Sequence, residues 1–465
     1  MNNISIISIL KRIGMKQLAQ LTAALLVLLM ASLSVANAQP AALDSVEENI
    51  SQRITDGPMV GVAVGYIHPD GEVSYLTKGN LTSTGSQNVT PESVFKIASV
   101  TKVFTALALA KLIDERSITL ESKAESLLGP EFSLPTYEGK EITLQHLVSH
   151  TSGLPRLPGN LQMKDPQNPY THYSKSKLQR FLADYKLTRA PGSSFQYSNL
   201  GMAIVGHILE EQYDLNYGEV IKKTITDPLN MSYTGIDLAT VDSTVRTHGH
   251  HQGDPVPYWN FPAVEAMGGL HSSIVDLTRF VNAHLRVNSP IADIASTVKQ
   301  PIFDVQHSGK RIDKVGMGWL LTTQQDSIWW HNGGTGGYSS FVGFNAETGA
   351  GVAVLGNARS SVDDIGLHLL DQDHRLKKVV SADELKKFVG QYTSDNGATY
   401  HISRQKSQLY VQRPGQPKFP IYFKKGSRFY LEAVNAEIEF SLQEGEVQQL
   451  TLFQNGQQYR AEKQN

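Results

Sequence analysis

The chain has 465 residues, of which 40% are hydrophobic and 18% charged. Its 42 basic and 44 acidic residues leave a formal net charge of -2 without blocks of one sign, which argues against a nucleic-acid partner or a membrane-surface protein. The chain has no cysteine, which excludes disulfides, thiol nucleophiles, zinc–thiolate sites and a lipid-modified N-terminal cysteine.

The first 38 residues have the pattern of a signal peptide. Lys11 and Arg12 precede an apolar run at 21–35, which ends in the small-x-small tripeptide 36–38. The run is shorter than the roughly 20 apolar residues that a spanning helix needs. We therefore expect cleavage after residue 38, no stable membrane insertion afterwards, and a periplasmic or secreted protein. Translation from Met15 would also give a complete signal, so the start stays open.

The next part of the chain, residues 39–380, is expected to form the first domain. Residues 60–64 and 72–76 flank a turn rich in Pro and Gly and predict a β-hairpin. Residues 98–113 are apolar almost all round and predict a helix buried on every side. Further elements follow in chain order: helices at 144–149, 176–185, 200–211 and 274–285, then strands at 339–345 and 351–355. Strands at both ends predict an α/β fold with one sheet, flanked by helices, and an inserted helical region.

The last part, residues 381–465, is expected to be a second domain, because about 425 residues exceed what one core usually holds. From about Ala382 helical periodicity nearly vanishes, and short alternating segments separated by Gly turns predict an antiparallel meander or small β-barrel. The candidate strands are 399–403, 408–412, 419–423, 428–434, 437–442, 447–453 and 457–461.

A nucleophilic serine is indicated at the start of the buried helix. The tetrad Ser-x-x-Lys also occurs at Ser8, Ser93, Ser174, Ser296 and Ser403, but only Ser99 lies in the first turn of an apolar helix. Free N–H groups and the helix dipole favour a developing oxyanion there. Lys102 lies three residues on and hence on the same face. The apolar surroundings should lower the pKa of its amine so that it acts as a base, whereas a solvated surface lysine would not.

Two more segments could complete this chemistry. Tyr197-Ser198-Asn199 precedes an apolar helix, so Tyr197 could shuttle protons and Asn199 could hydrogen-bond a substrate. Tyr258-Trp259-Asn260 has the same spacing but begins no helix. The segment 330–338 is rich in glycine, which lets backbone N–H groups approach a ligand, although an ordinary glycine-rich turn has the same composition.

A metal site is the alternative suggested by the histidines. His146 and His150 have helical spacing, and 248–251 holds three more histidines, but no glutamate accompanies the first pair as in His-Glu-x-x-His. We expect no metal and no cofactor, and expect His150 to fix a turn. The chain has no Gly-x-Ser-x-Gly elbow, which argues against the α/β-hydrolase route.

Four motifs together closely resemble the class C β-lactamase-related serine hydrolase family, which includes DD-peptidases, D-aminopeptidases and esterases. They lie at 95–105, 147–154, 191–199 and 331–333. The resemblance spans about 54–370 and implies a β-lactamase/transpeptidase-like fold with an antiparallel sheet. The tail from about 382 is similar to small β-barrel appendages of some members.

The resemblance also implies roles for individual residues. Ser99 would be the nucleophile, and Lys102 and Tyr197 would share the acid and base work. Asn199 would hold an amide of the substrate. The backbone N–H groups of Ser99 and Gly334 would bind the oxyanion.

One position departs from true class C β-lactamases, which carry Lys-Thr-Gly where this chain has His331-Asn332-Gly333. His331 and Gly333 would line the substrate site, but a histidine with a reference pKa of about 6.5 is mostly neutral at pH 7 and offers no permanent cation. The resemblance therefore favours a peptidase or esterase, acting on D-alanyl peptides of peptidoglycan or on small molecules. A true β-lactamase and a non-hydrolytic penicillin-binding receptor remain alternatives.

Overall fold

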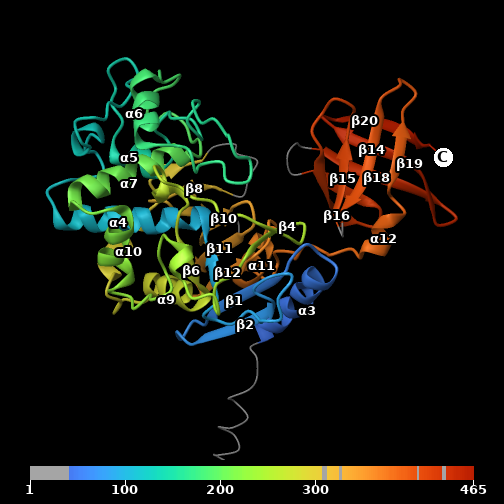
Figure 1. The fold of residues 1–465 in the computed structure, drawn as a ribbon, viewed down its shortest axis with the longest axis horizontal. Coiled ribbons are helices and arrows are strands. Elements are labelled where there is room, and N and C mark those ends of the chain that lie inside the picture. The colour runs from blue at the N-terminus through green and yellow to red at the C-terminus, as the bar shows by residue number, and fades with distance from the viewer. Residues whose placement is uncertain (1–40, 306–311, 324–326, 406–407, 432–435, 465) are drawn as a thin grey trace, which may run out of the picture. The chain divides into compact units, whose positions relative to one another are not determined.

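The computed structural model describes residues 41–305, 312–323, 327–405, 408–431 and 436–464 (Figure 1). The expected signal peptide, residues 1–38, lies outside these ranges. Across the described ranges, no helix combines the length and apolar character that crossing a membrane requires.

The chain up to residue 380 alternates between strands and helices. Its helices are α3 (Ala41–Thr55), α4 (Thr101–Glu115), α5 (Leu144–Val148), α6 (Lys175–Asp184), α7 (Asn199–Tyr213), α8 (Tyr217–Ile221), α9 (Ile274–Leu285), α10 (Ala292–Val298) and α11 (Asp363–Leu370). Its strands are β1 (Gly61–Ile67), β2 (Val73–Gly79), β3 (Val94–Lys96), β4 (Gly249–His251), β5 (Asp254–Val256), β6 (His271–Ser273), β7 (Phe303–Asp304), β8 (Lys314–Val315), β9 (Leu320–Thr322), β10 (Ile328–Gly334), β11 (Ser339–Asn345) and β12 (Gly351–Gly356).

The main sheet joins strands from both ends of this region. In the described residues its order is β2-β1-β12-β11-β10-β9-β8-β7, and all neighbouring strands are antiparallel. β11 is buried along its whole length, so both faces of the sheet are covered. A Cβ at Gly351 would meet Val281 of α9, whereas a Cβ at Gly366 of α11 would meet the ring of Phe341.

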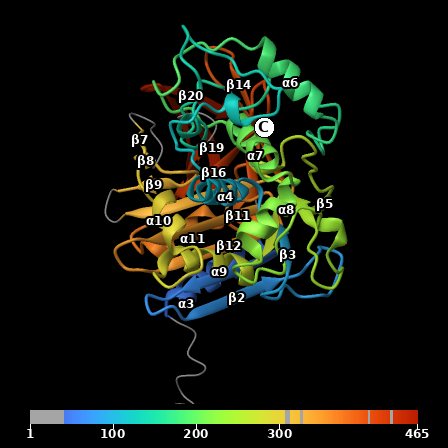
Figure 2. The same cartoon turned by 90° about the vertical axis from the view of Figure 1, so that its left-hand side faces the viewer.

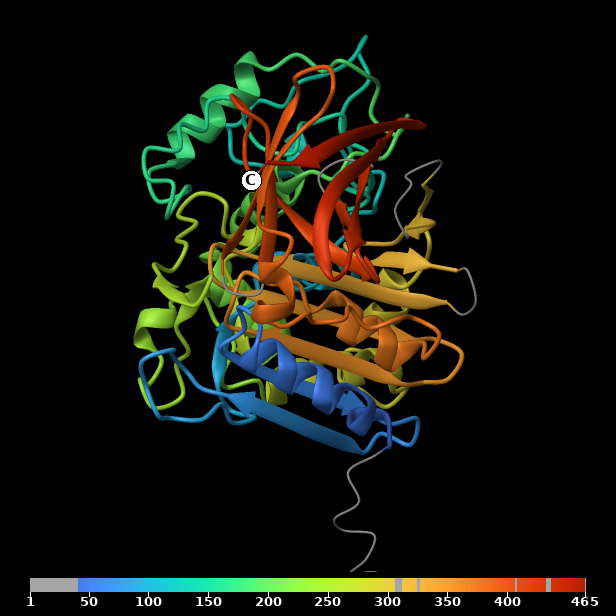
Figure 3. The same cartoon turned by 90° about the vertical axis from the view of Figure 1, so that its right-hand side faces the viewer.

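These contacts place the two helices on opposite faces. Gly351 pairs with Phe344, which points to the opposite side of β11 from Phe341 because side chains alternate along a strand. α9 therefore covers one face of the sheet and α11 the other. Figure 3 shows the second face, with the orange helix α11 in front of the orange strands.

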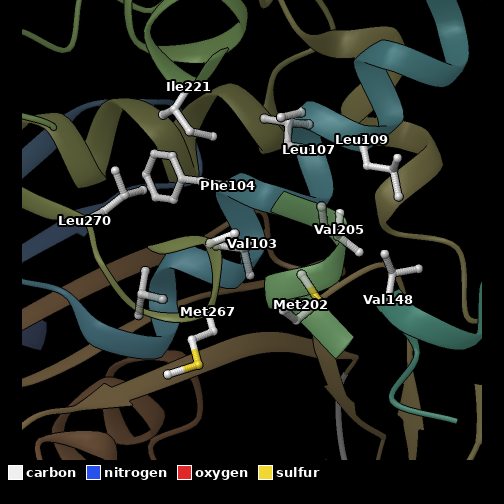
Figure 4. Close-up of a cluster of buried hydrophobic side chains, with 14 of the residues drawn as sticks. Val103, Phe104, Leu107, Leu109, Val148, Met202, Val205, Ile221, Met267 and Leu270 are labelled. Atoms are coloured by element: carbon white, nitrogen blue, oxygen red, sulfur yellow. The ribbon is translucent and has the colours of Figure 1, made fainter. Parts of the chain in front are cut away.

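Helix α4 lies in the interior of the chain up to residue 380, on the face of the main sheet that α9 covers. It packs against α7, α8 and α10, and Figure 2 shows it nearly end-on among these elements. Figure 4 shows Val103 and Leu107 of α4 together with Met202 and Val205 of α7 in one apolar cluster. Such a helix is apolar all round because it is covered on every side. The predicted burial is confirmed for residues 101–110 and Leu112, whereas Lys111 and Ile113 are half-buried and the last two residues of α4 are exposed.

The helical insertion lies between two short paired strands. β3 pairs with β6, with Val94 opposite Ser273, and α5, α6, α7 and α8 lie between them in the sequence. α9 follows β6 directly, and the Ser273 side chain caps it by accepting a hydrogen bond from the N–H of Asp276. The predicted bounds 274–285 match α9.

The C-terminal region is a closed antiparallel barrel with its own core. After the short helix α12 (Ala382–Lys386) its strands are β13 (Gly390–Thr393), β14 (Thr399–Gln405), β15 (Gln408–Gln412), β16 (Phe419–Lys425), β17 (Arg428–Leu431), β18 (Ala436–Gln443), β19 (Glu446–Gln454) and β20 (Gln457–Lys463). β13 pairs with β20 and closes the ring. Phe388, Tyr392, Phe429 and Phe440 fill part of the interior.

The fold class predicted from the sequence is confirmed, with differences at the ends of elements. Residues 390–393 form the strand that closes the barrel, yet this segment was not predicted as a strand because it is short and begins with glycine. Part of the predicted strand 428–434 lies outside the described residues. The predicted helix at 98–113 begins later: Ala98–Val100 form a 3-10 turn, and α4 starts at Thr101.

Candidate active site

Ser99 lies in the tight turn between β3 and α4. The turn is a 3-10 helix in which Ala98 has a φ of 48°, so the chain bends sharply just before Ser99. Residues on both sides are buried, whereas Ser99 is only half-buried. The bend therefore presents the hydroxyl of Ser99 from an otherwise closed part of the core.

Lys102 lies directly behind this hydroxyl. Its Nζ is 3.0 Å from Oγ of Ser99 and also donates to the carbonyl oxygen of Met267. The side chain is fully buried, and burial, together with the nearby charge of Arg156, brings the pKa of Lys102 well below 10.5. A neutral amine at this place can accept the proton of Ser99.

The segment 266–270, whose Met267 carbonyl accepts the hydrogen bond from Lys102, is joined to α4 by further hydrogen bonds. The hydroxyl of Thr105 donates to the carbonyl of Ala266 at 2.8 Å, and the N–H of Leu270 donates to the hydroxyl of Thr101 at 3.1 Å. The Met267 carbonyl is thus fixed relative to the helix that carries Lys102.

Tyr197 approaches Ser99 from the segment before α7. Burial raises the pKa of Tyr197 to about 12, an effect that a hydrogen bond with Ser99 and the charge of Arg156 partly offset. The phenol is therefore protonated at neutral pH. The ring of His150 lies against the Tyr197 ring, with 4.4 Å between centroids.

His150 holds the segment that carries Tyr197, which agrees with the expectation that it fixes a turn by hydrogen bonding. It is buried with a φ of 58°, and its Nδ1 accepts a hydrogen bond from the N–H of Ser198 at 3.2 Å. His146 lies elsewhere, in the capping box of α5. In the part of the chain that the structure describes, no three histidine or acidic side chains are grouped so as to hold a metal ion.

His331 lies behind Tyr197 on strand β10. Its Nδ1 is 2.7 Å from the carbonyl oxygen of Asn332, and its Nε2 is 3.4 Å from the hydroxyl of Tyr197. Burial lowers the pKa of His331 to about 3. The ring is therefore neutral and fully buried, and its Nε2 faces the hydroxyl of Tyr197.

Asn199 is the first residue of α7, next to the capping residue Ser198. The residue is 8% exposed, and its Oδ1 is buried without a hydrogen-bond partner among the described residues. An unpaired buried acceptor is costly, so this oxygen can bind an N–H group of a ligand.

The glycines of β10 bring the strand against the Ser99 turn. A Cβ at Gly333 would lie 2.3 Å from the carbonyl oxygen of Ile97 and 2.9 Å from the backbone N of Ser99. Thr335 donates its N–H to the carbonyl of Tyr338 at 3.0 Å, so the next pair along the hairpin, Gly334 and Ser339, is not hydrogen-bonded. The N–H of Gly334 therefore points away from β11 and is available.

The aromatic residues of the segment 330–338 and the competing serines have structural contacts of their own. Trp330 stacks on Phe341, on the α11 face of the sheet, and Tyr338 is buried with its hydroxyl on the carbonyl of Thr247. Among the competing serines, Ser174 caps α6 and Ser403 lies in the barrel strand β14. None of these contacts brings a lysine amine to a serine hydroxyl as at Ser99.

Arg156 was not singled out from the sequence. Its guanidinium carbon lies 4.9 Å from the centroid of the Tyr197 ring. The one available signal was its place directly after the motif at 147–154, two residues beyond Leu154.

Comparisons with known proteins show the family of the chain. A family model described as beta-lactamase matches residues 46–375, and one described as a domain of unknown function (DUF3471) matches residues 374–464. The D-alanyl-D-alanine-carboxypeptidase/endopeptidase AmpH of Escherichia coli (strain K12) is 29% identical, over 69% of this chain and 87% of its own. A penicillin-binding protein of Bacillus subtilis (strain 168) is 23% identical, over 82% and 90%.

Solved structures show the same fold. An octameric penicillin-binding protein homologue from Pyrococcus abyssi superposes with a TM-score of 0.67 at 22% identity, covering 90% of this chain and 99% of the other. A class C beta-lactamase superposes with a TM-score of 0.62 at 18% identity, covering 74% and 99%.

Proposed function

Since the chain belongs to the beta-lactamase family of serine hydrolases, we propose that it is a DD-peptidase that cleaves D-alanyl peptides through an acyl-enzyme on Ser99. The observation that carries this proposal is the contact between Ser99 and Lys102. A hydroxyl 3.0 Å from a fully buried amine is an activated nucleophile, and both groups lie beside a protonated phenol.

In the proposed reaction Lys102 takes the proton of the Ser99 hydroxyl while Oγ bonds to the substrate carbonyl carbon. The N–H groups of Ser99 and Gly334 bind the oxygen that becomes negative. Tyr197 donates its proton to the leaving nitrogen as the C–N bond breaks, and recovers one from Lys102. Water then attacks the acyl-enzyme, the same groups take its proton, and Ser99 leaves with a hydrogen restored.

The proposed preference for peptides rests on Asn199. The acyl part of a D-alanyl peptide carries an amide N–H next to the scissile bond, and the unpaired Oδ1 of Asn199 is an acceptor for it. A simple ester has no such donor. The Escherichia coli carboxypeptidase/endopeptidase among the relatives has the same substrate class by name.

The neutral state of His331 supports a peptidase over an efficient β-lactamase. The class C enzymes that the sequence resembles carry a lysine cation at this position, whereas burial lowers the pKa of His331 to about 3. The position therefore offers no positive charge for the carboxylate of a bicyclic β-lactam.

A substrate panel on the full mature protein tests the proposal. We expect D-alanine release from a diacetyl-L-lysyl-D-alanyl-D-alanine peptide, little release from the peptide that ends in L-alanine, and slow turnover of a chromogenic cephalosporin. Ser99→Ala should abolish all three. Faster turnover of the cephalosporin than of the peptide would instead identify a β-lactamase, and turnover of aryl esters alone an esterase.

A labelled penicillin separates a hydrolase from a non-hydrolytic receptor. The proposed enzyme acylates and then releases the label, whereas a receptor retains it. Lasting label on the wild-type protein, without peptide turnover, would contradict the hydrolase.

We further propose that the mature protein is periplasmic or secreted. The support is the basic, apolar and small-x-small pattern of residues 1–38. N-terminal sequencing of the protein recovered from its natural source is expected to begin at Gln39. An N-terminus at Met1 in the mature protein would contradict export with cleavage.

A further inference from the structure

Arg156 is held beside Tyr197 by its own backbone. Its carbonyl oxygen accepts hydrogen bonds from the N–H groups of Asn199 at 3.0 Å and Leu200 at 3.3 Å, the first two residues of α7. Its side chain is exposed, and the guanidinium carbon lies 4.9 Å from the centroid of the Tyr197 ring. The cation therefore lies over the phenol to which the proposed reaction assigns proton transfer.

The guanidinium is free to bind an anion. Within the described ranges, no carboxylate pairs with Arg156 and no hydrogen bond occupies its side-chain donors. An arginine packed on an aromatic face keeps five N–H donors, in a planar fork that matches a carboxylate. Such pairs are bidentate and stronger than neutral hydrogen bonds.

The charge of Arg156 acts on the site. After burial, it is the next cause that lowers the pKa of Lys102, and it also contributes at His150. His331 carries no charge at neutral pH, and Lys102 is needed in its neutral form. Of the described site residues, Arg156 is the permanent cation.

We propose, on the basis of the proposed acyl transfer at Ser99, that Arg156 binds a carboxylate carried by the leaving group and so selects substrates that end in a free acid. Tyr197 donates its proton to the leaving nitrogen. In a C-terminal amino acid one carbon atom separates this nitrogen from the carboxylate. A guanidinium over the ring of the proton donor is therefore within reach of that carboxylate.

Two esters with the same acyl group isolate this contact from peptide specificity. In one the leaving alcohol is glycolate, which carries its carboxylate one carbon from the leaving oxygen, and in the other it is glycolamide, which is neutral. The ratio of kcat/KM for the two is compared in wild type, Arg156→Gln and Arg156→Lys. Arg460→Gln is the charge-matched control, because Arg460 is exposed on β20 of the barrel.

We expect wild type and Arg460→Gln to prefer the acid. In Arg156→Gln the acid ester should lose about ten- to a hundredfold in kcat/KM, as for a charged hydrogen bond, while the neutral ester changes by less than about threefold. Arg156→Lys should retain part of the preference, since it keeps the charge but not the fork. An unchanged ratio in Arg156→Gln, or an equal loss on both esters, would overturn the inference.

Binding without chemistry separates this inference from the proposed function. In Ser99→Ala protein, calorimetry of the acid ester should show about tenfold weaker binding when Arg156 is also replaced by Gln. Equal affinity would sink the role of Arg156 even if D-alanyl peptides are cleaved. Weaker binding together with no peptide turnover would retain the carboxylate site and discard the DD-peptidase.

Discussion

The Nε2 atom of His331 lies 3.4 Å from the hydroxyl oxygen of Tyr197, while Nδ1 of the same ring lies 2.7 Å from the carbonyl oxygen of Asn332. A carbonyl oxygen only accepts, so Nδ1 carries the proton and Nε2 accepts a hydrogen bond from the phenol. Burial lowers the pKa of His331 to about 3, which keeps this arrangement intact at neutral pH.

The pH dependence of activity should therefore show no titration of His331. Since the pKa of this ring is about 3 rather than 6.5, kcat/KM should have no inflection from it between about pH 5 and 8. His331→Gln, which keeps an acceptor, should lower the profile without changing its shape. An inflection near pH 6.5 that is present in wild type and lost in the variant would show that the ring titrates in the free enzyme.

Lys102→Met should separate catalysis from stability. The variant removes the base and should lower kcat/KM by about 10²- to 10⁴-fold. The thermal midpoint should not fall, because a buried amine is replaced by an apolar chain of similar length. A matched loss of folded protein, measured by circular dichroism, would mean that the amine is structural.

The pH profile of the wild type gives a second readout on Lys102. Its pKa is lowered, so the neutral base accumulates as pH rises and kcat/KM should reach its plateau well below pH 10.5. A rise that continues to pH 10.5 would indicate an ordinary solvated lysine.

Gly333→Ala and Gly334→Ala form a matched pair on strand β10. The new methyl at Gly333 would lie 2.3 Å from the carbonyl oxygen of Ile97 and displace the strand from Ser99, whereas the one at Gly334 meets only the Tyr338 carbonyl oxygen at 3.9 Å. We expect Gly333→Ala to cost on the order of 1–3 kcal/mol in stability and to lose most activity. Gly334→Ala should fold as wild type. Equal stability of the two, by denaturant unfolding, would contradict the close approach.

Acid should destabilise the protein through three buried histidines. Burial lowers the pKa values of His271, His284 and His331 to about 3, 4 and 3, against 6.5 ordinarily. Between about pH 3 and 6.5 the unfolded chain therefore binds more protons than the folded protein, and the free energy of unfolding rises with pH. The stabilisation is complete above about pH 6.5 and is lost as pH falls toward 3.

The size of this effect is measured by denaturant unfolding at several pH values. His284→Phe should reduce the slope by about 1.4 kcal/mol per pH unit, the effect of one proton. His172→Gln, at an exposed position, should leave the slope unchanged. A slope in His284→Phe that equals that of wild type would show that His284 does not contribute.

Local patterns were enough to predict most of the secondary structure. The bounds of α9 were predicted to the residue, because a serine cap precedes an amphipathic helix there. The barrel strands were recognisable from their alternation and Gly turns. β13 was missed because four residues carry too little pattern, and only the closure with β20 defines them as a strand.

The sequence by itself determined the chemical groups of the site and the burial of Lys102, because both follow from residue type and local apolar pattern. Tertiary structure alone decided which groups face one another. His331 and Tyr197 are 134 residues apart, and their hydrogen bond depends on where the fold places β10 relative to the segment before α7. Arg156 lies over Tyr197 because its carbonyl caps α7. Such contacts join segments distant along the chain, so no local pattern records them.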